Sequence, residues 1–351
     1  LCVKLLLTTA LSEGEYLEES WTVVLQCVSH LARLLMVATG GQTDELFFSD
    51  TASVSSEHGG AGGARQAAFL RRASSLKSGR DGGAPGGSDA FTKLFMGVSR
   101  AESARLVEEA NGELLSRDID STLIDRVFSA STALSGGSVL HFVSSLCEVS
   151  MQEIHASLAA YRGVKEGSLS AHPSSNSASE SPTASPRVFS MQKLVEVADL
   201  NMSVRGRMEW SHIWALLANH FSVVGLTDNQ ALCMFAIDSL KQLSIKFLQK
   251  EELSNFNFQR LFLKPFEKIM SRARSADTKD LILRCLHAMI QSCAANIHSG
   301  WRSMLSVFGA AAAQDNAEVA RLAFEIVEQL VTQRYALLVG DFVHLMNCLN
   351  S

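Results

Sequence analysis

The chain has 351 residues, of which 47% are hydrophobic and 19% charged, and its 31 basic and 36 acidic side chains leave a net charge of −5. This balance predicts no nucleic-acid partner, because basic side chains on phosphates dominate that kind of binding. The best apolar run, residues 23–38, is interrupted by Gln26, His30 and Arg33. We therefore expect no membrane span and a soluble, cytoplasmic chain. A length near twice that of a common domain predicts more than one unit.

Shifts in composition divide the chain into five segments. Residues 1–48 have a helical pattern, and residues 49–90 form a Gly/Ala/Ser-rich insert that we predict to be disordered, because it is too poor in apolar side chains to offset chain entropy. A second helical segment covers residues 91–162, and a Ser/Pro-rich linker covers residues 163–187. The longest ordered block is residues 188–351.

All three ordered parts have the periodicity of amphipathic helices. Apolar side chains recur at three- and four-residue steps, and no part shows the sustained alternation of a half-buried strand. The clearest stripes are Leu17, Trp21, Val24, Leu25, Val28, Leu31 and Leu35, and then Val139, Phe142, Val143, Leu146 and Val149.

The last block repeats a short polar break followed by an apolar helix. Asp228 precedes residues 231–248, Asp277 precedes residues 281–297, and Asp315 and Asn316 precede residues 319–331. These side chains are suited to capping helix N-termini. The breaks are 49 and 38 residues apart, a spacing typical of HEAT or armadillo repeats. We predict an all-α, right-handed α-solenoid of antiparallel helical repeats with disordered insertions, in which Pro265 breaks or kinks one helix.

No pattern of catalytic or metal-binding residues emerges from the sequence. Seven cysteines without a C-x-x-C pair indicate neither a disulfide framework nor a zinc site. No phosphate-binding glycine loop occurs in a strand-to-helix context, so we expect no catalytic residue, no cofactor, no metal and no small-molecule substrate. Glu209 and His212 have the i,i+3 spacing of a carboxylate metal site, but without a second copy we interpret them as a pair on a helix surface.

Three serines in the low-complexity segments fit kinase patterns. Ser74 follows two arginines, as basophilic kinases prefer, and Ser181 and Ser185 each precede a proline. Phosphorylation would add about two negative charges at each position. We predict these serines as candidate phosphorylation sites.

Two aromatic features are candidates for an interaction surface. Trp210 and Trp214 are i,i+4 neighbours and follow Arg207, and Trp and Arg are common anchors of interfaces. The second feature is the turn that contains Asn296, Ser299, Gly300 and Trp301. The alternative interpretation is structural: the tryptophan stripe is inter-helix core, Trp301 starts a packed helix, and Asn296 and Ser299 cap or turn the chain.

The third block contains a set of specific sequence runs. They are Phe189 to Glu196, Asn201, Met202, Glu209, Trp210, Ser211, Ile213, Trp214, Phe235 to Leu240, Asn255 to Gln259, Phe262 to Glu267, Ala294 to Ile297 and Ser299 to Trp301. With these residues, the block resembles the first homology region downstream of the catalytic domain in large Arf guanine-nucleotide exchange factors of the brefeldin-A-inhibited type. The resemblance covers all three ordered parts.

This resemblance implies a non-catalytic fragment that begins just after the exchange domain, usually called the Sec-seven domain. It implies an Arf-family GTPase as partner, with Arl or Rab GTPases as alternatives, together with the upstream exchange domain, the Golgi membrane surface and a homodimer. The implied role is to control recruitment to trans-Golgi network membranes, autoinhibition and activation by Arf-GTP. The alternative hypothesis is a helical-repeat scaffold or adaptor of vesicle or nuclear transport that has no link to nucleotide exchange.

Overall fold

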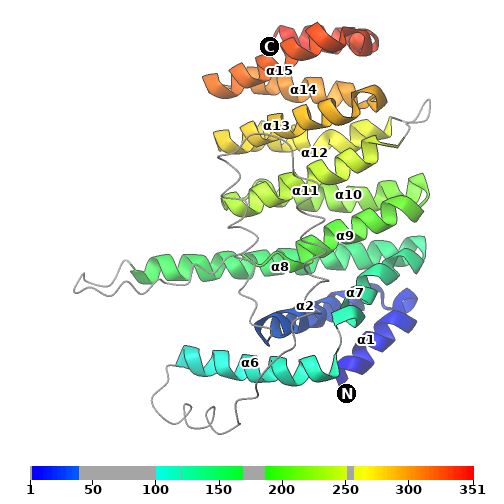
Figure 1. Ribbon diagram of the computed structural model, residues 1–351, viewed down its shortest axis with the longest axis vertical. Coiled ribbons are helices and arrows are strands. Elements are labelled where there is room, and N and C mark those ends of the chain that lie inside the picture. Colours follow the sequence, from blue (N-terminus) through cyan, green and yellow to red (C-terminus); the bar gives the residue numbers. More distant parts are fainter. Residues whose placement is uncertain (1, 39–99, 120, 169–185, 251–256) are drawn as a thin grey trace, which may run out of the picture. The chain divides into compact units, whose positions relative to one another are not determined.

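A computed structural model of the chain describes residues 2–38, 100–119, 121–168, 186–250 and 257–351. These residues form α-helices and short 3-10 helices without a strand, which confirms the all-α prediction (Figure 1). The insert predicted at 49–90 and the candidate phosphorylation sites Ser74, Ser181 and Ser185 lie outside the described residues. The α-helices are α1 (Cys2–Ser12), α2 (Trp21–Ala38), α6 (Arg100–Asp118), α7 (Ser121–Ser129), α8 (Gly136–Ser168), α9 (Phe189–Val204), α10 (Arg207–Val224), α11 (Gln230–Leu248), α12 (Phe258–Arg272), α13 (Ala276–Cys293), α14 (Gly300–Ala312), α15 (Ala317–Leu338) and α16 (Phe342–Leu349).

The chain divides into two units. The first contains residues 1–7, 26–125 and 155–187, and the second contains residues 8–25, 126–154 and 188–351. In the first unit, α6 approaches the end of α2 so closely that a Cβ on Gly112 would lie 2.3 Å from the Leu34 carbonyl oxygen. A larger side chain would push the two helices apart, so glycine is required at this crossing.

In the second unit, an aromatic cluster joins α2, α7, α8 and α9. Trp21 packs edge-on against Phe142 with ring centroids 4.8 Å apart, and its indole nitrogen donates to the Gly14 carbonyl oxygen at 3.1 Å. Phe128 contacts both Phe142 and Phe189. The indole N–H of Trp21 has a partner although the ring is buried, as is usual for tryptophan.

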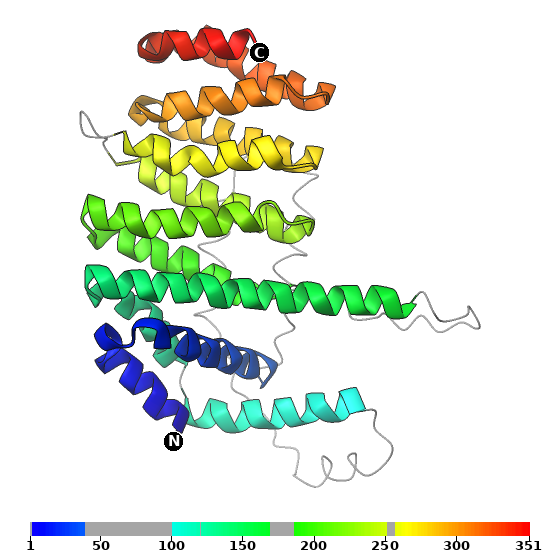
Figure 2. The same ribbon diagram turned by 180° about the vertical axis from the view of Figure 1, so that it is seen from behind.

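Beyond this cluster, the second unit is built from two layers of helices. Helices α10, α12, α14 and α16 contact one another in succession and form the layer nearest the viewer in Figure 2. Helices α9, α11, α13 and α15 form the other layer. Each helix therefore packs against the helix two positions further along the chain, which is the arrangement of a helical repeat protein.

The caps of these helices differ in part from the prediction. Asn316 caps α15, where its side chain accepts hydrogen bonds from the backbone of residues 318 and 319, as predicted. The prediction for Asp228 and Asp277 was wrong. Asn229 caps α11 by accepting from the Leu232 amide, and Asp277 lies inside the first turn of α13. Adjacent polar residues compete for one cap position, and the sequence pattern does not decide between them.

Two helices run beyond their predicted ends, and a third passes through a proline. α8 continues to Ser168, inside the segment predicted as a linker. α15 continues to Leu338 past a kink at Arg334, whose φ and ψ are −135° and 23°. α12 includes Pro265 without a break, which corrects the first of the two predicted effects of this proline, a break or a kink.

Residues Glu18–Ala38 form a helical stretch that is long and apolar enough to cross a membrane by length and composition. This finding corrects the expectation that no such segment exists, although a core helix of a soluble protein passes the same test. Trp21, Leu25 and Val28 in this stretch are buried, as in a core helix. Cys27 in the same helix is exposed.

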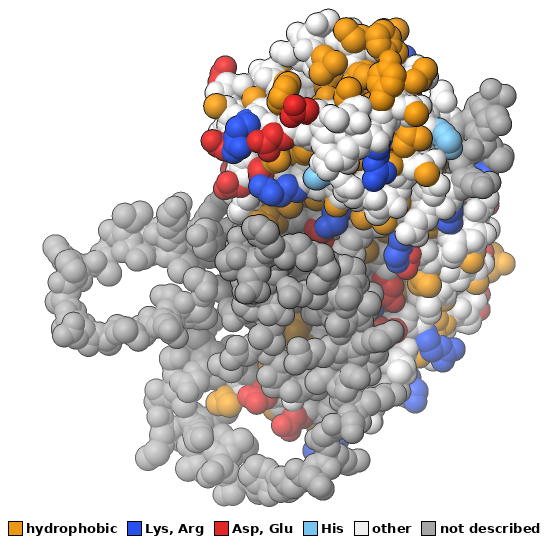
Figure 3. Space-filling view, turned by 45° about the horizontal axis from the view of Figure 1, so that its top comes forward, with side chains coloured by type: hydrophobic (Ala, Val, Ile, Leu, Met, Phe, Trp, Pro, Cys, Tyr) orange, Lys and Arg blue, Asp and Glu red, His pale blue; other side chains and the backbone are white. Residues whose placement is uncertain are grey.

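Apolar side chains gather at the end of the second unit formed by the C-terminal helices (Figure 3). Several large apolar side chains of α15, α16 and the short 3-10 helix between them are exposed at this end. The exposed residues are Tyr335, Leu337, Val339, Phe342, Val343, Met346 and Leu349.

Candidate functional site

The two tryptophans of the predicted interaction surface lie in the core. Trp210 is 3% exposed and Trp214 is 2% exposed. The Trp214 ring stacks on Phe262 of α12 with centroids 3.6 Å apart, and Phe262 stacks in turn on Phe247 of α11 at 4.3 Å. Both tryptophans therefore hold α10, α11 and α12 together, and the structural interpretation of this stripe replaces the surface hypothesis.

Trp214 also accounts for the unbroken path of α12 through Pro265. A proline has no amide N–H, so the carbonyl four residues earlier, that of Leu261, loses its helical donor. The Trp214 indole nitrogen donates to this oxygen at 3.4 Å. Pro265 itself is buried within α12. A side chain from the neighbouring helix thus supplies part of what the proline removes.

The second predicted feature, the turn before α14, is held by a glutamine that the sequence analysis left without a role. Gln259 is fully buried, and its amide donates to the Asn296 carbonyl oxygen at 2.8 Å. Its side-chain oxygen accepts from the amides of His298 at 2.8 Å and Gly300 at 3.3 Å. One side chain therefore fixes both ends of the turn against α12.

The named residues of this turn are structural too. Trp301 is 2% exposed near the start of α14, and Gly300 is buried. A Cβ added to Gly300 would lie only 3.1 Å from the Gln259 side chain. Ser299 accepts from the Arg260 amide at 3.3 Å. Asn296 is half-buried, and only its backbone carbonyl is engaged by Gln259. The interpretation that these residues turn the chain and start a packed helix is the one the structure supports.

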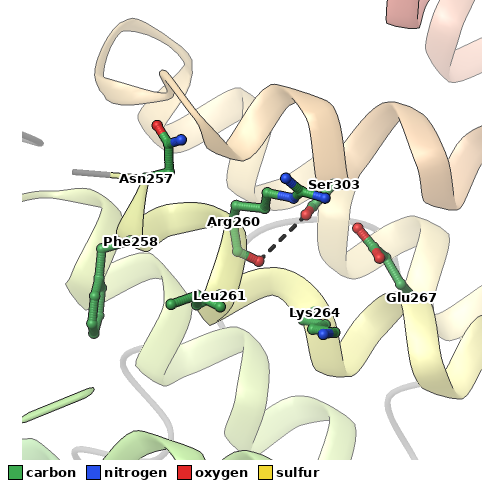
Figure 4. Close-up of a pocket in the computed structure, with 7 residues that line it drawn as sticks. All are labelled: Asn257, Phe258, Arg260, Leu261, Lys264, Glu267 and Ser303. Carbon is green, nitrogen blue, oxygen red and sulfur yellow. Dashed lines mark hydrogen bonds between the residues drawn. The ribbon is translucent and has the colours of Figure 1, made fainter. Parts of the chain in front are cut away.

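Arg207 is the one residue of the predicted surface set with an exposed side chain, at the start of α10. Further along the same layer lies a feature that the sequence analysis missed, a groove between α12 and α14 with a volume of about 370 Å³ (Figure 4). Its lining includes Arg260, Leu261, Lys264 and Ser303. The signal that could have revealed it is the four-residue spacing of basic residues in α12.

A buried polar network fixes the start of the helical layers. Asn201 of α9 is fully buried and donates to the Ser131 hydroxyl at 2.9 Å. Arg205 donates to the Asn201 side-chain oxygen at 3.0 Å and to the Ser131 carbonyl oxygen at 2.7 Å. Buried polar groups are stable only when they are paired in this way. Asn201, one of the residues that carry the family resemblance, is therefore structural.

The titratable groups of the second unit point to packing rather than chemistry. Burial lowers the pKa of His220 to about 4, and its Nε2 lies 3.1 Å from the Ser150 hydroxyl. Burial raises the pKa of the Cys285 thiol to about 12, so this thiol stays protonated and unreactive. Glu209 and His212 are both exposed. In the ranges that the structure describes, no group of three His, Cys, Asp or Glu side chains could hold a metal ion.

The comparisons with known proteins point to one class. A family profile described as Mon2/Sec7/BIG1-like, HDS matches residues 246–329. These residues include the end of α11, all of α12 to α14, and the first part of α15. The match therefore covers Phe247 and Phe262 of the aromatic stack but not Trp214, and it covers the turn held by Gln259 and the groove between α12 and α14.

Individual relatives extend this similarity to nearly the whole chain. The brefeldin A-inhibited guanine nucleotide-exchange protein 1 of Homo sapiens is 33% identical over 358 residues, which cover 99% of this chain and 16% of that protein. The protein of the same name from Arabidopsis thaliana is 33% identical over 334 residues, which cover 95% of this chain and 18% of the relative. The chain thus spans less than a fifth of the length of these exchange proteins and is similar to one region of them.

Proposed function

We propose that this chain is a non-catalytic regulatory region of an Arf guanine-nucleotide exchange factor. The observation that carries the proposal is the similarity along 99% of the chain to a single region of a guanine nucleotide-exchange protein. The described residues support a role in binding, because they form layered helices whose polar networks and buried thiols are structural. Such layers offer long surfaces to partners.

In this proposal, the chain acts in cis on an exchange domain that lies upstream. The region would hold that domain in a less active arrangement, and Arf-GTP would favour the released one, because a ligand shifts a population toward the state it binds better. The partners are an Arf-family GTPase, with Arl and Rab GTPases as alternatives, the exchange domain and the Golgi membrane. The protein would be recruited peripherally to the cytoplasmic face of trans-Golgi network membranes. It would act there as a homodimer.

The experiment is nucleotide exchange on membrane-bound Arf. The exchange domain of the intact polypeptide is compared alone and extended through Ser351, each with and without preloaded Arf-GTP. Slower basal exchange by the extended protein, restored by Arf-GTP, is the expected result. Equal rates in all four conditions would contradict regulation and favour a scaffold or adaptor role in vesicle or nuclear transport.

A further inference from the structure

The outer face of α12 carries a line of positive charge. Arg260, Lys264, Lys268 and Arg272 follow one another at four-residue steps, and we call them the basic stripe. Three of them are exposed, and Lys268 is half-buried and donates to the Asn219 side chain at 3.4 Å. At a rise of about 1.5 Å per residue, successive charges are roughly 6 Å apart and the stripe is about 18 Å long.

Among the described residues, the basic stripe is not matched by ion pairs. No carboxylate of the described residues forms an ion pair with any member of the basic stripe. Like charges at i,i+4 positions destabilise a helix, and the stripe contains three such pairs. The arrangement is therefore a small cost to folding that an external anion would remove.

An apolar groove lies beside the stripe. Leu261 is 54% exposed and is the one large hydrophobic side chain of α12 that faces solvent. It lines the groove with Phe258 from α12 and Ser303 from α14 (Figure 4). Arg260 and Lys264 flank the same groove. The apolar groove and the basic stripe thus adjoin each other on the surface of α12.

We propose that this face of α12 binds an extended acidic segment of a partner protein. Alternate side chains of an extended chain are about 6.6 Å apart, which matches the step of the basic stripe. Aspartate or glutamate at alternate positions would then face the stripe, and an apolar side chain at one end would enter the groove beside Leu261. This assignment does not depend on a role in nucleotide exchange.

A flat anionic membrane fits these features less well. Helices that bind in a membrane interface present an apolar face of several side chains, whereas α12 exposes only Leu261. A single line of charges beside a concave site therefore favours a peptide.

The test is binding of a fluorescein-labelled peptide in which glutamate alternates with serine over eight positions and a phenylalanine follows. Fluorescence anisotropy is measured with the 351-residue chain, the variant R260E/K264E and the control R284E/R321E. The control changes the net charge equally but lies on α13 and α15. We expect the first variant to weaken binding about tenfold or more and the control to stay within about twofold, with weaker binding at higher salt.

A second measurement separates binding to a peptide from binding to a membrane. The same proteins are sedimented with vesicles that contain phosphatidylserine, and circular dichroism verifies that each is folded. The peptide measurement is repeated with the neutral variant R260Q/K264Q, in which the change in charge is smaller than in R260E/K264E. Equal binding by both charge-reversed variants would overturn the proposal. So would binding to vesicles through Arg260 and Lys264 without binding to the peptide, or no saturable binding by the unchanged chain.

Discussion

The two helical layers of the second unit carry charge in different ways. Helices α9, α11, α13 and α15 contain seven basic and eight acidic residues, whereas α10, α12, α14 and α16 contain six basic and two acidic ones. In the first layer, basic side chains pair with carboxylates of the same layer. These pairs are Lys193 with Glu196, Lys241 with Asp238, Lys246 with Asp199, Arg284 with Asp280, and Arg321 with Glu318 and Glu325.

The difference shows that one sequence can use similar residues for opposite purposes. In the layer of α9, α11, α13 and α15, each ion pair stabilises its helices by a few tenths of a kcal/mol. Unpaired charges on α12 give the helix no such support and remain available to a ligand. The buried face of α12 has a third role, because Phe262 and Gln259 hold it to α10, α11 and the turn before α14.

The largest loss of stability is expected from a substitution on the buried face of α12. Phe262→Ala removes a fully buried ring that lies between Trp214 and Phe247. Loss of such a ring lowers the free energy of unfolding by about 3–5 kcal/mol. Phe324→Ala is the matched control, because Phe324 of the other layer is 60% exposed. Urea unfolding measures both, and similar losses in the two variants would contradict the assignment of the core.

Gln259→Ala tests the polar part of the same face. The substitution leaves the Asn296 carbonyl and the amides of His298 and Gly300 without their partner. Unpaired buried groups cost about 1–3 kcal/mol, so we expect a loss of about 2 kcal/mol in urea unfolding. Gln230→Ala changes an exposed residue at the start of α11 and should stay within about 0.5 kcal/mol of the unchanged chain.

His220 in α10 should make the layer sensitive to acid. Its pKa is lowered to about 4 by burial, below the value of 6.5 for an unperturbed histidine. The unfolded state therefore binds the proton more readily, so this contribution to stability is complete above pH 6.5 and is lost as the pH falls toward 4. Between pH 7 and pH 5 the loss is about 2 kcal/mol. His220→Gln should remove this part of the pH dependence, and an unchanged slope in urea unfolding would contradict it.

A double-mutant cycle tests the compensation at Pro265. Trp214→Phe removes the indole donor to the Leu261 carbonyl oxygen and should cost about 1 kcal/mol beyond the loss of ring area. In the background of Pro265→Ala, an amide of α12 again supplies that donor, so the hydrogen-bond part of the cost should disappear. Equal costs of Trp214→Phe in both backgrounds would show that the two positions are independent.

Much of the fold follows from sequence periodicity, and the site does not. The apolar stripes predict the helices of the last block because burial of one face is a local property of sequence. The course of α12 through Pro265 depends on Trp214, which is 51 residues earlier, and no local rule contains that contact. Likewise, Trp210 and Trp214 qualify equally as anchors or as core until the partner helix is known.

The unfolding free energies of R260E/K264E and R284E/R321E test the contrast between the layers most directly. In the first variant, K264E makes a favourable i,i+4 pair with Lys268 but a repulsive i,i+3 pair with Glu267, and positions 260 and 264 stay like-charged. The free energy of unfolding is therefore expected to change by less than about 0.5 kcal/mol. The second variant turns the ion pairs of Arg284 and Arg321 into repulsions and should lose about 1 kcal/mol. A loss in both variants of the same size would contradict the account, because the basic stripe would then be part of what holds the fold together.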